Sequence, residues 1–211
     1  MRHIYPPTQT IGSNMDDIIA NRNRIIEAQR QLFSDHTDSK ALCLDVGCGG
    51  ATRPGWVGID KYVVAPGVIK ADMYKLPYED GTVDVIHSSH SLEHLSLRRS
   101  HLALRDWFRA LRSGGVLFLS MPDLDAIMRI LLSPITPAQR RWYMYTLFGW
   151  QAPMGTPDVD DAKDDPGQYH CSGHSLQTIT EELLGIGYII NESYLFEGYG
   201  TPGLYVNARK P

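Results

Sequence analysis

The chain has 211 residues, of which 43% are hydrophobic, and a formal net charge of -4 at neutral pH. This length and composition predict a single globular domain with room for a large insertion. The negative charge argues against a nucleic-acid-binding protein that relies on bulk electrostatic attraction, because such domains are usually basic.

Targeting features of the sequence favour a cytoplasmic protein. No apolar run is long enough to cross a membrane, and no secretory leader is visible. Cys43, Cys48 and Cys171 do not form a disulfide framework and suit a reducing compartment. We therefore expect no membrane partner and a cytoplasmic location.

Residues 1–34 predict an N-terminal arm followed by a helix. The arm is rich in proline and polar residues, and the sequence that begins at Ser13 fits a capping box. Ile18, Ile25 and Leu32 recur every seven residues, which indicates a helix with a narrow apolar stripe.

Short apolar segments then alternate with a helical segment at about 98–112. This alternation predicts an α/β fold with a doubly wound, mostly parallel sheet and helices on both faces. Residues 122–174 interrupt the pattern as an insertion, and a final helix is capped by Ser175. The expected strands are 41–46, 56–59, 67–71, 83–88, 115–120, 188–196 and 203–209.

The insertion itself predicts two helices and a solvated loop. Leu124 to Leu132 is apolar enough for a helix, and Thr136 followed by Pro137 reads as a helix cap with proline in the first turn. Five aspartates between residues 158 and 165 predict an exposed loop.

The stretch from Leu42 to Asp60 predicts a site for a nucleoside-containing cofactor. A buried strand ends in Asp45, a glycine-rich turn follows, and the next strand ends in Asp60. Glycines let the backbone approach a ligand without Cβ clashes. An acid at the end of the second strand can accept hydrogen bonds from both hydroxyls of a ribose.

Four ordered segments resemble class I S-adenosylmethionine-dependent methyltransferases. The resemblance implies a Rossmann-like methyltransferase fold for a single domain, 1–211, with an N-terminal arm and helix at 1–34 and an acceptor-site insertion at 122–174. The turn Arg53-Pro54-Gly55-Trp56 is similar to a subgroup of small bacterial methyltransferases, many of them associated with cell-surface polysaccharide or secondary-metabolite pathways. The segments are 42–60, Ala71-Asp72-Met73-Tyr74-Lys75-Leu76-Pro77-Tyr78, 83–95 and 111–122.

The resemblance implies S-adenosylmethionine as cofactor and assigns residues to its parts. Asp60 would bind the ribose hydroxyls, Asp72 and Met73 the adenine, and the turn from Asp45 to Gly49 the amino-acid end. The complete cofactor-binding set is Asp45, Gly47, Cys48, Gly49, Asp60, Lys61, Asp72, Met73, Ser88 and Ser89.

Two features depart from the family pattern. Ala51 stands where the family more commonly has glycine, and the short gap from Asp45 to Asp60 leaves little room for a helix between the first two strands. An NAD-type dehydrogenase or a nucleotide-binding domain without catalysis stays open. The nicotinamide fingerprint, however, needs a third glycine at the start of a helix, whereas Thr52 and the proline after Arg53 are poor helix sequence.

Histidines are the candidate catalytic residues. Methyl transfer is an in-line displacement, so the protein must align the nucleophile and remove the proton of a hydroxyl acceptor. Histidine suits this role because its pKa lies near neutrality. His90 follows the fourth strand, and His170 and His174 lie where the insertion rejoins the domain, whereas His94 is better explained as a structural residue.

We expect no metal site from the sequence. His170, Cys171 and His174 could ligate zinc, but no paired motif supplies a fourth ligand. Asp123 and Asp125 could bind a divalent cation, and a helix cap is the better explanation of Asp123.

The sequence predicts O-methylation of a hydroxyl on a small molecule or saccharide, with no nucleic-acid acceptor and with a homodimer allowed. A catalytically silent cofactor-binding subunit that activates a partner methyltransferase is the alternative. Aromatic residues of the insertion are predicted to line the acceptor pocket or to form core. They are Trp142, Tyr143, Tyr145, Phe148 and Trp150.

Overall fold

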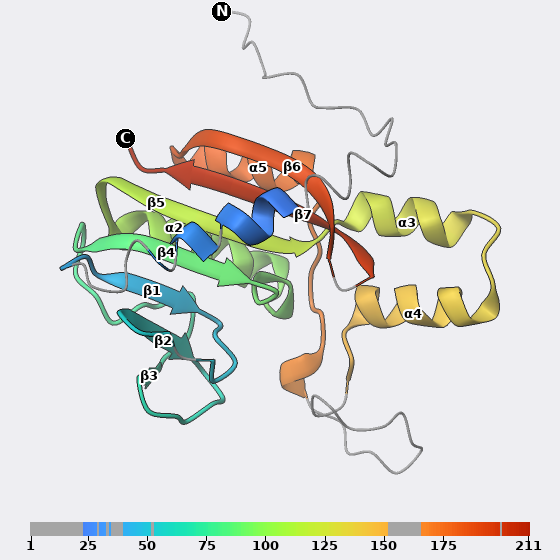
Figure 1. Ribbon diagram of the computed structural model, residues 1–211, viewed down its shortest axis with the longest axis horizontal. Coiled ribbons are helices and arrows are strands. Elements are labelled where there is room, and N and C mark those ends of the chain that lie inside the picture. Colours follow the sequence, from blue (N-terminus) through green and yellow to red (C-terminus); the bar gives the residue numbers. More distant parts are fainter. Residues whose placement is uncertain are drawn as a thin grey trace, which may run out of the picture.

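The computed structural model describes residues 23–28, 30–32, 34, 40–51, 53–151, 166–198 and 200–211. In this part of the chain, seven strands form one sheet in the order β3-β2-β1-β4-β5-β7-β6 (Figure 1). The strands are β1 Cys43–Val46, β2 Trp56–Asp60, β3 Val68–Lys70, β4 Val83–Ser89, β5 Leu111–Pro122, β6 Ile189–Gly198 and β7 Thr201–Arg209.

The strand directions confirm a mostly parallel sheet with an antiparallel edge. β1 to β5 pair in parallel, whereas β7 lies antiparallel between β5 and β6. A Rossmann-type dinucleotide-binding sheet has the strand order 3-2-1-4-5-6. The antiparallel β7 therefore argues against the dehydrogenase alternative.

Helices cover both faces of the sheet, as the alternating pattern predicts. The helices α2 (Leu97–Ala110) and α5 (Leu176–Ile186) pack on one face, where Trp107 and Leu183 are buried in the main core. Helical residues 23–28, 30–32 and 34 lie over the opposite face (Figure 1). There Ile25 and Leu32 join two smaller buried clusters. The described part of the N-terminal helix thus packs on the sheet, while residues 1–22 lie outside the described residues.

The connection between β1 and β2 contains turns and no helix among its described residues. Gly47 N donates a hydrogen bond to Ile59 O at 2.8 Å, so the chain passes directly from the end of β1 to a position beside β2. The short gap in the sequence predicted this departure. After β4, a single turn of 3-10 helix, η1 (Leu92–His94), precedes α2.

The insertion contains the two predicted helices, α3 (Leu124–Leu132) and α4 (Pro137–Phe148), and then a 3-10 turn, η2 (Pro166–Gln168). They lie beyond the end of the sheet (Figure 1). Thr136 forms the cap of α4, and Gly149, with φ of 83°, ends it. The aspartate-rich stretch at 158–165 lies outside the described residues. None of the described helices is both long and apolar enough to span a membrane.

The expectation that some aromatic side chains of α4 belong to the core is wrong. No residue of α4 is buried. The helix packs mainly on α3 and not on the sheet, so its apolar residues do not enter the main core.

Candidate active site

The glycine turn after β1 is fitted closely to the loop after β4. Gly47 has φ of 74°, and a Cβ on this residue would lie 2.2 Å from Ser91 Cβ. At Gly49, with φ of 56°, an added Cβ would meet no atom within 4 Å. Packing therefore requires a glycine at residue 47, and the backbone at residue 49 is open to a ligand.

Cys48 directs its side chain towards β2. A Cβ on Gly58 would lie 2.8 Å from Cys48 Sγ, and burial raises the pKa of the thiol. The Cys48 backbone N–H donates to Ile59 O at 3.3 Å.

Asp60 holds the glycine turn from the end of β2. Its Oδ2 accepts a hydrogen bond from Gly49 N at 3.0 Å. Its Oδ1 accepts from Tyr62 N at 2.8 Å and from Val63 N at 3.0 Å. A carboxylate has about four acceptor positions. One position on Oδ2 can therefore take a ribose hydroxyl, and a second hydroxyl must replace or share one of the backbone bonds.

The segment after β3 lies beside the same turn. Lys61 Nζ lies 2.7 Å from Asp72 Oδ1, so the two predicted cofactor residues form an ion pair. The Met73 carbonyl accepts a hydrogen bond from Trp107 Nε1 at 2.7 Å. The Met73 Cε lies 3.6 Å from the position that a Cβ on Gly47 would occupy. The structure thus brings the proposed adenine-binding and glycine-turn residues together.

Asp45 is buried between two basic side chains. Its Oδ1 lies 2.8 Å from His87 Nδ1, and Oδ2 pairs with the Arg53 guanidinium. Burial and the charge of Arg53 lower the pKa of His87 to about 3. The imidazole is therefore neutral at physiological pH and donates its Nδ1–H to the carboxylate.

Sequence reasoning missed His87 and Arg53 as partners of Asp45. The available signal was a histidine inside the apolar strand 83–88. The pairing follows only from the register of β1 with β4, which sets Asp45 beside His87.

The two predicted cofactor serines differ in exposure. Ser88 is buried, and its hydroxyl is bonded to that of Ser91, which donates to Val46 O at 3.2 Å. Ser89 accepts from Ser120 Oγ at 2.8 Å and is partly exposed at the end of β4. Ser88 therefore supports the turn from within, and Ser89 lies nearer the surface.

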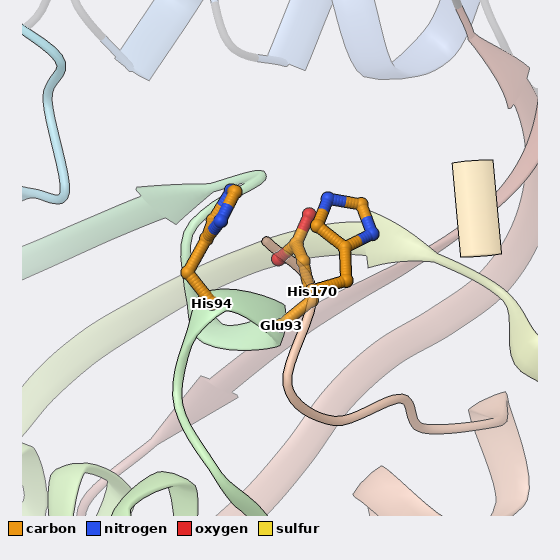
Figure 2. A group of neighbouring side chains, drawn as sticks. All are labelled: Glu93, His94 and His170. Atoms are coloured by element: carbon orange, nitrogen blue, oxygen red, sulfur yellow. The ribbon is translucent and has the colours of Figure 1, made fainter. Parts of the chain in front are cut away.

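Three histidines surround the buried carboxylate of Glu93. His90 Nδ1 lies 3.5 Å from Glu93 Oε1. His94 and His170 offer ring nitrogens that lie, with a Glu93 oxygen, within 4.8 Å of one another. Figure 2 shows the carboxylate between the rings of His94 and His170. Burial raises the pKa of the Glu93 carboxyl, but the hydrogen-bonding and charge effects of the histidines outweigh it and the net direction is downward.

His90 has a left-handed backbone conformation. Its φ is 50°, which is uncommon for a residue other than glycine. His90 N donates to Ser120 O at 2.9 Å, which fixes the loop against β5. Such strained positions gather at functional sites, and this one lies at the carboxyl end of β4.

His174 lies between two helices. Its Nε2 is 3.0 Å from Ser100 Oγ on α2, and its Nδ1 is 3.7 Å from Glu182 Oε2 on α5. Burial lowers the pKa of its imidazole. Both ring nitrogens thus face protein groups, and the catalytic role of His174 stays a prediction.

Asp123 acts as the cap of α3. Its Oδ1 accepts from Ala126 N at 2.7 Å and its Oδ2 from Leu176 N at 2.8 Å. The carboxylate therefore ties the start of α3 to the start of α5. This geometry agrees with the cap interpretation and engages both oxygens that a cation would need.

The aromatic residues of the insertion are partly exposed. Trp142 is 43% and Phe148 47% exposed. The rings of Tyr145 and Trp150 lie 4.9 Å apart, and Trp142 Nε1 donates to Gly200 O at 3.0 Å. Their role as an acceptor pocket stays a prediction.

Comparison with known proteins points to one family. A methyltransferase-domain family matches residues 56–119. A protein of Encephalitozoon cuniculi (strain GB-M1) that is named as a methyltransferase is 27% identical over 119 residues, which cover 50% of this chain and 57% of that protein. The chain thus spans little more than half the length of this curated relative.

Solved structures share the fold at low sequence identity. A methyltransferase from Methanosarcina mazei aligns with a TM-score of 0.62 and 13% identity, over 85% of this chain and 96% of that chain. Magnesium protoporphyrin IX methyltransferase from Synechocystis PCC 6803 has a TM-score of 0.55 and 11% identity, over 96% and 89% of the two chains. The third structure is a chain in the complex of the Haloferax volcanii Trm112 methyltransferase activator with a methyltransferase. It aligns with a TM-score of 0.54 and 13% identity, over 92% of this chain and 95% of that chain.

The fold is shared with solved S-adenosylmethionine-dependent methyltransferases, and residues 56–119 match a methyltransferase-domain family. The cofactor that these similarities indicate is S-adenosylmethionine. The open backbone at Gly49 and the free acceptor position on Asp60 fit a nucleoside at this place.

Proposed function

We propose that the chain catalyses S-adenosylmethionine-dependent methylation of a hydroxyl group on a small molecule or saccharide. The main support is the convergence of two groups at one edge of the sheet. The proposed cofactor acids are Asp60, the last residue of β2, and Asp72, which follows β3, and the His90–Glu93 pair follows β4. Parallel strands present their carboxyl ends to the same crevice.

In this proposal His90 removes the acceptor proton. The cofactor supplies an activated methyl group when bound, so the protein needs only to orient the acceptor and accept its proton. Glu93 Oε1 lies 3.5 Å from His90 Nδ1 and carries a buried negative charge. That charge stabilises the imidazolium that forms when His90 Nε2 takes the proton. His170, whose ring also lies beside Glu93, is the second candidate for this role.

The experiment replaces His90 with alanine and measures turnover and cofactor affinity separately. General-base catalysis is typically worth about a hundredfold or more. We expect turnover to fall at least about tenfold, while the dissociation constant for S-adenosylmethionine changes by less than about threefold. His174→Ala tests the other predicted base in the same assay. The acceptors to be tested are the small molecules or saccharides made by the enzymes that neighbouring genes encode.

The exposed histidine His101 supplies the matched control. Its Nδ1 lies 2.8 Å from Glu182 Oε1 on α5 and its side chain is 47% exposed, so His101→Ala is expected to leave turnover unchanged and is the control for the His90 and His170 variants. Unchanged turnover in the His90, His170 and His174 variants would reject histidine base catalysis. An equal loss in the His101 variant would show that the assay reports general damage.

A catalytically silent subunit is the second candidate. One structure of similar fold is a complex with a methyltransferase activator, so association with a second chain occurs on this fold. Exposed apolar side chains on α3 and α4, including Leu132, Trp142 and Phe148, offer a contact surface for a partner or a second copy. Cofactor binding without turnover, together with co-purification of a second methyltransferase chain, would favour this candidate. Light scattering of the purified chain tests the homodimer.

A further inference from the structure

We propose that Glu93, His94 and His170 form a binding site for a divalent transition-metal ion of the zinc type. The three ligand atoms lie within 4.8 Å of one another. Glu93 and His94 lie in η1, and His170 lies near the end of the insertion, just after η2, so the site exists only in the folded chain. The cofactor acids play no part in it.

The first argument is the buried charge of Glu93. Glu93 is 2% exposed, and His90 Nδ1, at 3.5 Å from Oε1, is too distant for a hydrogen bond of good geometry. An isolated buried carboxylate costs several kcal/mol as an order of magnitude, unless a cation or hydrogen bonds compensate it. A divalent ion between the carboxylate and the rings of His94 and His170 would compensate this buried charge directly.

The second argument is the protonation of the two histidine rings. His94 Nδ1 lies 3.1 Å from Tyr169 O, and His170 Nδ1 lies 2.9 Å from Thr146 O. A carbonyl oxygen only accepts, so in each ring Nδ1 carries the hydrogen and donates it. In the neutral ring, Nε2 then keeps the lone pair. Histidines that bind metals are oriented in this way, with the second nitrogen donating to a carbonyl or carboxylate.

The geometry and ligand types favour zinc-like ions over magnesium. The rings of His94 and His170 have centroids 4.8 Å apart and are nearly perpendicular, at 84° (Figure 2). Two imidazoles and one carboxylate suit zinc, iron, cobalt and related ions, whereas magnesium prefers oxygen ligands. Tetrahedral bonds of about 2.0–2.1 Å place ligand atoms roughly 3.3 Å apart, so side-chain rotation must draw the ligands inward by about an ångström.

This site differs from the metal-binding groups that the sequence suggested, which were His170 with Cys171 and His174, and Asp123 with Asp125. The structure bonds Asp123 to two backbone amides and His174 to Ser100. The sequence gives no sign of Glu93 as a ligand, because its contact with the segment at residue 170 is tertiary.

The site also bears on the acceptor, and this step rests on the proposed function. An ion bound beside His90 leaves coordination positions for an acceptor oxygen. Coordination lowers the pKa of a hydroxyl and orients its oxygen. The acceptor would then be a molecule with two neighbouring oxygens that can chelate the ion.

The test uses the complete chain after treatment with a chelator and dialysis. Zn²⁺ is titrated by calorimetry, and Co²⁺ is followed by its visible absorption, which reports coordination by protein ligands. We expect one ion per chain at the site, and about a hundredfold weaker binding in Glu93→Gln and in His170→Asn. Mg²⁺ at the same concentration should produce no binding signal.

Two control variants separate this site from adventitious binding. Cys171→Ser removes an exposed thiol beside His170, and His101→Gln removes an exposed histidine on α2. Both should bind the ion as the wild type does. If the Cys171 control abolishes the Co²⁺ signal, the ion is held by a thiol and the proposal is rejected.

Measurements on the wild-type chain test the metal site even if a variant fails to fold. Binding of Zn²⁺ at a hundred times its dissociation constant should stabilise the native chain by about 2.7 kcal/mol, seen as a higher Tm. No titration signal and no rise in Tm for the wild type would overturn the proposal. Cofactor binding is measured in the same samples by calorimetry with S-adenosylhomocysteine. Failure of the methyltransferase proposal is thereby distinguished from failure of the metal site.

Discussion

Replacement of Asp60 by alanine tests the cofactor site most directly. The Asp60 carboxylate accepts hydrogen bonds from Gly49 N, Tyr62 N and Val63 N, and it keeps one acceptor position for a ribose hydroxyl. Alanine would remove the proposed ribose contact, and it removes the link that holds the glycine turn. Asp60→Ala should therefore lower both the affinity for S-adenosylmethionine and the free energy of unfolding, and each effect can be measured separately.

The expected losses of affinity and stability follow from the number of hydrogen bonds that Asp60 makes. A hydrogen bond to a charged group contributes about 1.5–3 kcal/mol. One bond to the ribose then corresponds to a roughly tenfold to hundredfold loss of affinity for S-adenosylmethionine. The three backbone bonds are at or near the surface, so we expect their loss to lower the free energy of unfolding by only about 1–2 kcal/mol.

Calorimetry with S-adenosylmethionine and with S-adenosylhomocysteine measures the affinity without an acceptor. Thermal denaturation measures the stability of the same samples. The matched variant Asp60→Asn keeps the size and one acceptor oxygen but removes the charge, so its affinity should lie between those of wild type and Asp60→Ala. Unchanged affinity in Asp60→Ala, with the protein folded, would refute the assignment of this residue to the ribose.

Two further predictions concern the glycine turn and the buried histidine. Gly47→Ala should lower the free energy of unfolding by more than about 2 kcal/mol, because the new Cβ collides with Ser91 and the backbone is left-handed. Gly49→Ala should lower it by only about 1–2 kcal/mol, because the backbone is left-handed but no atom lies near the new Cβ. Chemical denaturation compares the two, and calorimetry should show weaker cofactor binding in the Gly49 variant; equal stability losses would contradict the packing argument. The pKa of His87 is lowered to about 3, so between pH 6.5 and 3 the unfolded chain binds the proton that the folded chain excludes. The full contribution of His87 to the free energy of unfolding is present above about pH 6.5. It is lost as the pH falls from about 6.5 to about 3, and the total loss is about 3–5 kcal/mol. Denaturation curves of wild type and His87→Asn across this range should show a smaller pH dependence in the variant, and identical slopes would show that His87 does not carry the effect.

The sequence by itself determined the elements and the part of the site that is local in the chain. Apolar runs that end in Asp45 and Asp60, with glycines between them, specify two strands and a turn. The pattern of apolar residues and glycines that defines these elements lies within one short segment. The capping sequences at Thr136 and Ser175 likewise fixed helix starts that the structure confirms. The short gap before Asp60 correctly indicated that a helix is missing there.

Tertiary structure decided which distant residues meet. Asp45 pairs with His87 only because β1 lies beside β4 in one register, and nothing in either segment specifies that register. Glu93 is surrounded by histidines because the segment at His170 returns to η1, where Cys171 N donates to Glu93 O at 2.8 Å. The exposure of α4 depends in the same way on where the insertion packs. Periodicity and spacing describe one segment at a time, whereas these contacts arise from the burial of several segments against one another.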